Sequence, residues 1–303
     1  HYEWRCGEHG RARDAFGRAA TLYEKWMQQT GLGVRDCVPW TRAKLYQITA
    51  LASMGDYEPA LDEAERLAAI EVTPEQAMSR GGRALLWEAK TLPMRILLRR
   101  RAPGDAKLAT RFLPAADEVT DYGKATLAVW SFQLHSTVVG ARVALNEGDL
   151  ETAKKLSANL HQLGQRFVKT QKAADAYGER SEWLRAFRSF EVMASELSGL
   201  ITMAGPESFR GTAYNWYQSA ADRQGRASLM RPPMVLLPME FRLAEHYAER
   251  GENPKAIEAL LEGLKAWPND VELLRALKDR FEAEGLDERV EEVSKKMATV
   301  EGW

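Results

Sequence analysis

The chain has 303 residues, of which 45% are apolar and 28% are charged, and its formal net charge is −1. This composition is that of a folded protein, because a disordered chain has fewer apolar residues and a larger net charge. The 42 basic and 43 acidic residues balance, so no overall field draws the chain to nucleic acid, and we expect no nucleic-acid partner.

One local pattern recurs along the chain. A glycine, usually followed within two residues by an acid or Asn, ends one segment of helical periodicity, and a small residue falls five positions after it. Glycine ends helices readily because it adopts the left-handed conformation at little cost, and an Asp or Asn side chain caps the next helix. We predict helix–helix turns at the clearest matches and a weaker one at Gly205. The clear matches are Gly7, Gly55, Gly104, Gly148, Gly251 and Gly285.

The chain before Gly7 is too short for a full first helix. About a dozen residues are needed for the first helix of a pair, so we expect this helix to be truncated and any targeting segment to be missing. Cys6 and Cys37 both fall near the first helical pair, and a disulfide bridge and two reduced thiols both remain open. Their spacing with His1 and His9 fits no zinc pattern, so we expect no metal site.

Between Gly55 and Gly104 the sequence predicts an interrupted helix. Thr73 and Gln76 have the spacing of a capping box around Pro74, and Pro93 should kink or divide the helix that follows. A group of cations then surrounds the next turn: Arg95, Arg99, Arg100, Arg101, Lys107 and Arg111. Such a group suits a phosphate or an acidic peptide, but cations also favour the C-terminus of a helix, which is the simpler interpretation.

The second half of the chain predicts long helices and then a break. Long helices are expected at about residues 121–146 and 175–204, and a Pro-rich linker at 226–237. We therefore expect an irregular long-helix array over 1–225 and C-terminal repeats over 238–303, packed as a continuation of the same array. No period-two alternation of apolar residues indicates a sheet.

The C-terminal part carries the most specific pattern. It resembles the signature of the tetratricopeptide-repeat (TPR) family at Leu243, Ala244, Tyr247, Gly251, Ala256, Leu260 and Pro268, and partly at Leu277, Phe281, Gly285 and Val290. The resemblance implies an all-α fold, a TPR-like α-solenoid of antiparallel helix pairs in a right-handed superhelix. Gly251 and Gly285 are 34 positions apart, which is the period of the family. Earlier glycines are 44 to 57 positions apart, which predicts longer, irregular helices upstream.

The resemblance also implies where a partner binds. In TPR proteins the first helix of each pair lines the concave face, and the corresponding polar residues here are Arg42, Arg101, His135, Arg142 and Glu245. We expect a protein–protein interaction scaffold that binds a peptide or protein partner along this face and belongs to a larger protein. The asparagines of a clamp for a chaperone's C-terminal carboxylate are absent, so we do not expect that clamp.

Nothing in the sequence indicates catalysis. His161 and His246 have no carboxylate or thiol arrangement typical of a triad or a metal helix, so we expect no enzyme and no cofactor. Two alternatives stay open, a helical regulatory domain that senses a ligand and, less expected, an enzyme built on the scaffold. No apolar run reaches the roughly 18 residues that span a bilayer, and the compartment is not indicated.

Overall fold

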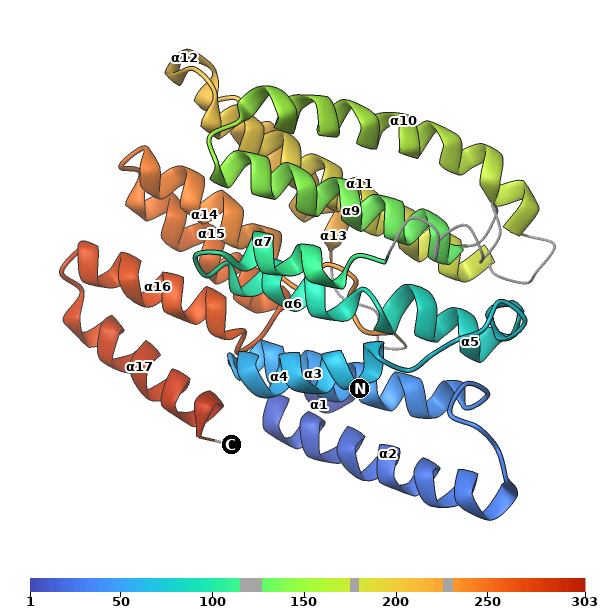
Figure 1. Ribbon diagram of the computed structural model, residues 1–303. Coiled ribbons are helices and arrows are strands. Elements are labelled where there is room, and N and C mark those ends of the chain that lie inside the picture. The colour runs from blue at the N-terminus through green and yellow to red at the C-terminus, as the bar shows by residue number, and fades with distance from the viewer. Residues whose placement is uncertain (115–126, 175–179, 226–230, 303) are drawn as a thin grey trace.

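The protein is described by a computed structural model that covers residues 1–114, 127–174, 180–225 and 231–302. Over these residues the chain is all-α and contains no strand (Figure 1). The prediction of an all-α fold is confirmed. The expected long helices are also present in their described parts, α9 (Leu127–Asn146) and α11 (Arg180–Ala204), whereas residues 121–126 and 175–179 lie outside the described residues.

The helices follow one another with short connections. The first part of the chain forms α1 (Tyr2–Arg5), α2 (His9–Thr30), α3 (Val38–Met54) and α4 (Tyr57–Ala68). Shorter elements follow: η1 (Gln76–Met78), α5 (Arg80–Ala84), the π-turn η2 (Leu85–Ala89), α6 (Leu92–Arg100), α7 (Asp105–Ala109) and η3 (Thr110–Phe112). Beyond α9 the chain forms α10 (Leu150–Ala174), α11, α12 (Glu207–Arg210), α13 (Ala213–Gln224), α14 (Met239–Glu249), α15 (Asn253–Ala266), α16 (Val271–Ala283) and α17 (Asp287–Glu301).

The predicted glycine turns are present. All six clear matches have a positive φ, between 67° and 88°. Gly205 does not have a positive φ, but α11 ends at Ala204 just before it and α12 begins at Glu207, so the predicted helix–helix turn is present in another backbone conformation. The following acid caps the next helix at Asp149, whose carboxylate accepts from the backbone N–H of Thr152 at 3.0 Å. Asp105 acts differently, because its carboxylate accepts from the backbone N–H of Ala102 and pairs with Arg100.

The interrupted helix between Gly55 and Gly104 is also present. Both hydrogen bonds of the capping box form, from the Thr73 N–H to the Gln76 side chain at 3.0 Å and from the Gln76 N–H to the Thr73 hydroxyl at 3.3 Å. They cap only the short 3₁₀ turn η1, not a long helix. Pro93 stands in the first turn of α6, where its missing N–H costs no helical hydrogen bond, so it divides α6 from η2.

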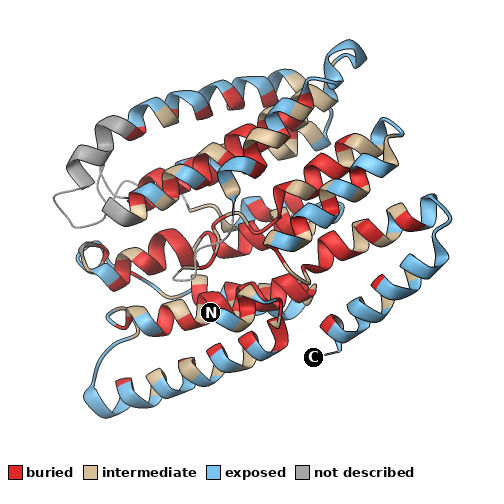
Figure 2. Cartoon of the chain, turned by 180° about the vertical axis from the view of Figure 1, so that it is seen from behind, coloured by how far each residue is buried: buried red, intermediate tan, exposed pale blue. Residues whose placement is uncertain are grey.

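The array of helices closes on itself. Successive helices pack side by side from α2 to α17, and α16 also packs against α3. The indole rings of Trp4 and Trp267 meet edge to face with centroids 6.1 Å apart, and the Asn269 side chain donates to the Gly7 carbonyl oxygen at 3.1 Å. Figure 1 shows the first helices and the last ones side by side. Buried residues gather toward the centre, and exposed residues cover outer helices such as α2, α10 and α17 (Figure 2).

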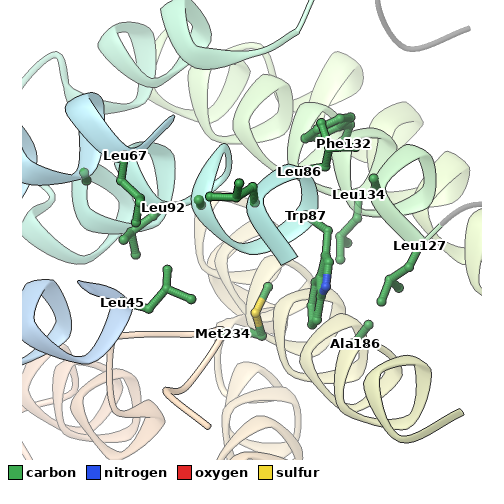
Figure 3. Close-up of a cluster of buried hydrophobic side chains, with 14 of the residues drawn as sticks. Leu45, Leu67, Leu86, Trp87, Leu92, Leu127, Phe132, Leu134, Ala186 and Met234 are labelled. Atoms are coloured by element: carbon green, nitrogen blue, oxygen red, sulfur yellow. The ribbon is translucent and has the colours of Figure 1, made fainter. Parts of the chain in front are cut away.

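The segment between α13 and α14 lies inside this array. Its described part, residues 231–237, is called the inner segment below. It connects two helices, as the predicted linker should, but it is not an exposed linker, because the side chains of Met234, Leu236 and Leu237 are buried. Figure 3 shows Met234 in the core among Leu45, Trp87 and Ala186. Pro232 and Pro233 have no N–H group, so fewer backbone donors need a partner in this interior position.

Candidate functional site

The arginines of α6 hold the inner segment by its backbone. Arg95 donates from Nε to the Met234 carbonyl oxygen at 2.8 Å and from Nη2 to the Pro233 carbonyl oxygen at 2.5 Å. Arg99 donates from Nη1 to the Leu236 carbonyl oxygen at 2.5 Å. Both guanidinium groups are buried. The predicted group of cations around Gly104 is therefore divided, and these two members are occupied within the protein.

Arg99 also joins α6 to two other helices. It donates from Nε to the Ala52 carbonyl oxygen at the end of α3 at 3.0 Å, and from Nη2 to Asp270 before α16 at 2.9 Å. Burial alone would lower the pKa of Arg99, but the neighbouring Asp270 carboxylate raises it, so the guanidinium stays charged. Asp270 in turn caps α16 by accepting from the N–H groups of Glu272 and Leu273. One buried ion pair thus ties the inner segment to the closing contact of the array.

The predicted groove residue Arg142 lies in a buried ion triplet. Its Nη2 is 2.6 Å from Oε1 of Glu196 on α11, and Nε of Arg242 on α14 donates to the same oxygen at 2.8 Å. Burial would raise the pKa of Glu196, but the two arginines outweigh it and lower the pKa to about 2. Glu196 is therefore ionised at neutral pH, and the triplet joins α9, α11 and α14.

Arg101 and Glu245 continue this network toward the surface. Glu245 accepts from Nη1 of Arg242 at 2.6 Å and lies 3.9 Å from Nη1 of Arg101. Arg101 donates to Glu272 at 2.8 Å, and its guanidinium group lies over the Phe241 ring at 3.8 Å from the centroid. The side chain of Glu245 is 42% exposed and that of Arg101 is 20% exposed. The structure thus brings Arg101, Arg142 and Glu245 into one network that reaches the surface at Glu245.

His135 stands apart from this network. The imidazole is fully buried, and Nδ1–H donates to the Ser131 carbonyl oxygen at 2.8 Å within the same helix. Nε2 has no hydrogen-bond partner among the described residues. Burial lowers the pKa of His135 to about 4, so the ring is neutral at physiological pH. A neutral, enclosed imidazole can orient its neighbours but cannot meet a partner directly.

Arg42 belongs to a second charged group, called the basic cluster below, which consists of Arg42, Arg80, Arg185 and Arg231. The centre of the group is Glu88, a buried residue of η2. Arg185 approaches Glu88 with both guanidinium ends at 3.0 Å, and Arg231 lies 3.6 Å from the same carboxylate. Burial would raise the pKa of Glu88, but Arg185, Arg95 and Arg231 outweigh it and lower the pKa.

The other two members of the basic cluster have no such partner. Arg42 on α3 and Arg80 on α5 form no hydrogen bond or ion pair with any residue that the structure describes, and Nε of Arg42 is buried without a hydrogen-bond partner. Burial, and after it repulsion from Arg80, lowers the pKa of Arg42. Repulsion from Arg42 and Arg80 also contributes to lowering the pKa of Arg231, after burial. The four arginines are therefore close enough for their positive charges to repel one another.

A small cavity lies between α6, α9, α11 and the inner segment. It has a volume of about 30 Å³ and is lined by Arg95, Arg142, Glu196 and Met234 among others. This volume holds one or two water molecules, whereas an organic ligand needs roughly 300 Å³ or more. The cavity therefore suits water that bridges the buried charges and gives no support to a ligand sensor.

The sequence did not single out Glu196, Arg242, Arg185 and Arg231, although they organise both charged groups. The missed signal is a charge placed on the apolar face of a helix, as at Glu196 before Leu197 and at Arg242 between Phe241 and Leu243. Such a charge is buried only when it has a partner of opposite sign. The partner is distant in the sequence, so only the fold identifies it.

Other features of the chain do not add a site. Within the described ranges no three His, Cys, Asp or Glu side chains are placed to hold a metal ion, and Cys6 and Cys37 are both free. In the same part of the chain, every helix is too short or too polar to cross a membrane. No protein-family model matches the sequence, and comparisons with curated proteins and with solved structures give no significant match.

Proposed function

We propose that this chain is a TPR-like α-solenoid of antiparallel helix pairs, wound as a right-handed superhelix, and acts as a protein–protein interaction scaffold. It belongs to a larger protein, and its partner is a peptide or protein segment that lies along the inner face of the array. The TPR-like signature from Leu243 to Pro268 supports the repeat assignment. The observation that supports a polypeptide partner is that arginine side chains bind the backbone carbonyl oxygens of the inner segment.

The inner face is the set of side chains that surrounds the inner segment. It contacts the backbone of that segment, and such contacts do not depend on the sequence of the polypeptide that is bound. Arg95, Arg99 and Gln224 donate to carbonyl oxygens of the inner segment, while Met234 and Leu236 fill apolar space. Main-chain hydrogen bonds that give affinity, together with pockets for alternate side chains, are a recurring mode of peptide recognition. A face with this chemistry suits a second extended segment beside the inner one.

The partner surface that we propose runs over Arg42, Arg101 and Glu245. These three keep exposed side-chain area and offer charges of both signs. The side chain of Arg142 is only 13% exposed, and His135 is fully buried. They support the surface from inside, Arg142 through Glu196 and Arg242, and do not touch the partner.

Affinity capture from the native organism, followed by mass spectrometry, identifies the partner. The affinity of the purified partner is then measured for the wild type and for Arg42→Glu and Glu245→Lys, with Arg289→Glu on the outer helix α17 as the matched control. Reversal of a charge at the contact should weaken binding at least tenfold, or about 1.4 kcal/mol, and the control should bind as the wild type does. Equal affinity for all four proteins would exclude this surface. A substrate turned over at one cleft would exclude the scaffold role.

A further inference from the structure

A second small cavity lies at the closing contact, where the first helices of the array meet the last ones. The residues that line it come from both ends of the chain, and among them are Trp4, His9, Ser53, Trp267, Pro268 and Asp270. The volume of the cavity is about 10 Å³. One water molecule needs roughly 10 to 15 Å³ of such space, so the cavity suits a single water and nothing larger.

Three of the lining residues carry ring nitrogens that have no hydrogen-bond partner among the described residues. These atoms are Nε1 of Trp4, Nε1 of Trp267 and both nitrogens of His9. The three residues are 4%, 5% and 5% exposed, respectively. Their rings lie close together, since the Trp4 ring centroid is 6.1 Å from that of Trp267 and 6.4 Å from that of His9. Buried polar atoms without a partner cost free energy, so their concentration at one cavity indicates a bound molecule that satisfies them.

These nitrogens include both donors and an acceptor. Each indole N–H can only donate. Burial, and after it the charge of Arg99, outweighs the nearby Pro268 backbone and lowers the pKa of His9 to about 4. The imidazole is therefore neutral at pH 7, with one N–H and one bare nitrogen that accepts a hydrogen bond.

This mixture of groups distinguishes water from a small ion. A cation would face the indole N–H groups, which cannot accept a hydrogen bond. Arg5 also lines the cavity, but a chloride ion is larger than a water molecule and would lie near the Asp270 carboxylate. Water is the ligand of this size that both accepts and donates.

We propose that this cavity binds one water molecule, which joins the two ends of the array. The water accepts from the indole N–H groups of Trp4 and Trp267 and donates to the bare nitrogen of His9. Three hydrogen bonds are typical of a buried water. The water supplements the direct contacts at this place, the edge-to-face pair of indoles and the hydrogen bond from Asn269 to Gly7. This inference does not depend on the scaffold role, because no partner takes part in the bridge.

The first experiment detects the water by NMR, on the full chain with isotope-labelled tryptophan at pH 7. A long-lived bound water gives NOE and ROE cross-peaks of opposite sign with the protons next to it, whereas proton exchange gives peaks of the same sign. The indole N–H protons of Trp4 and Trp267 should both show the opposite signs at the water frequency. The absence of these peaks at either indole would overturn the proposal.

A variant excludes a signal that is relayed by a side chain. The Ser53 hydroxyl lines the same cavity, and its proton exchanges with solvent. The cross-peaks of both indoles should therefore persist in Ser53→Ala. Their loss in this variant would show that the hydroxyl, and not a bound water, gives the signal.

The second experiment compares Trp→Phe at three buried indoles. Trp130 is the matched control, because it is 4% exposed and its Nε1 also lacks a described partner, but it lines neither of the two cavities. Each substitution removes the same part of a ring, and only Trp4→Phe and Trp267→Phe also remove a hydrogen bond to the water. Their unfolding equilibrium constants should rise by roughly fivefold more than that of Trp130→Phe. Equal increases in the three variants, measured by urea unfolding, would overturn the bridge.

Discussion

Glu240 has a buried carboxyl group at the start of α14, and its Oε2 has no hydrogen-bond partner among the described residues. Burial raises its pKa from the ordinary 4.5 to about 7. The protonated form is therefore favoured in the folded protein. The raised pKa of Glu240 adds to the free energy of unfolding. This contribution is fully present below pH 4.5, and it is lost as the pH rises through 7.

Glu240→Gln should remove this pH dependence. The neutral amide avoids an ionised group in the interior, so the variant should be more stable than the wild type at pH 8, by roughly 1 to 3 kcal/mol, and similar to it at pH 4. Urea unfolding at the two pH values measures this difference. Glu258→Gln, an exposed position on α15, is the control and should show no pH-dependent change. A stability difference that is the same at both pH values would contradict the assignment.

The buried hydrogen bonds of Arg99 predict a large loss of stability when its side chain is removed. Arg99→Ala leaves Asp270 buried without its cation and frees two carbonyl oxygens, so we expect a loss of about 3 to 5 kcal/mol. Chemical denaturation monitored by tryptophan fluorescence measures it. Arg289→Ala breaks an exposed pair with Glu292 and should cost less than about 0.5 kcal/mol. Losses of equal size would show that the buried pair has no special role.

At the scale of elements, the inner segment is a non-helical stretch that packs in the core between the surrounding helices. It has no regular hydrogen bonds of its own, so side chains from surrounding helices satisfy its carbonyl groups. Gln224, the last residue of α13, shows how this is done. Its amide donates to the Val235 and Leu237 carbonyl oxygens and accepts from the Met239 N–H at 2.8 Å. One side chain therefore fixes both the inner segment and the start of α14.

Gln224→Ala should loosen this junction. Three hydrogen bonds are lost, for which we expect about 2 to 3 kcal/mol of destabilisation and faster hydrogen exchange at the Met239 amide. Hydrogen exchange followed by mass spectrometry measures the local effect. Gln218→Ala on the same helix removes only an exposed bond to Asp222 and should leave the exchange at Met239 unchanged. Unchanged exchange in Gln224→Ala would mean that other contacts hold the inner segment.

At the scale of the whole molecule, the two ends of the array are in contact, and we expect this contact to stabilise the fold. Gly7 has a φ of +82°, and a Cβ there would lie 2.6 Å from the Pro268 carbonyl oxygen across the closing contact. Gly104 has a similar φ of +88° but nothing within 4 Å of that position. An alanine would therefore have similar backbone strain at both positions, and only the one at position 7 would also clash with Pro268.

Gly7→Ala and Gly104→Ala form a matched pair. Gly104→Ala should cost about 1 to 2 kcal/mol from left-handed strain alone, and Gly7→Ala should cost at least about 1 kcal/mol more from the clash. Urea unfolding of both variants measures the difference. Equal losses would show that the ends of the array do not depend on each other in solution.

The sequence by itself determined the helices and their ends. Apolar periodicity gave the all-α fold, and glycine gave the left-handed turns, because both are local properties of a few adjacent residues. The poorer match at Gly205 also follows the end of a helix, α11, but its φ is not positive. The resemblance to the TPR family named Arg101, Arg142 and Glu245 as partner-binding residues, and the fold joins these three in one network.

Only the tertiary structure decided what these side chains contact. Arg99, Arg142 and Arg185 have partners in other parts of the chain, up to 171 positions away in the sequence, as in the pair of Arg99 and Asp270. The Pro-rich stretch at 226–237 has the composition of an exposed linker. Its described part is buried instead, because arginines on other helices satisfy its carbonyl groups. Charge pairing and burial depend on the assembled interior, and no short window of sequence contains that information.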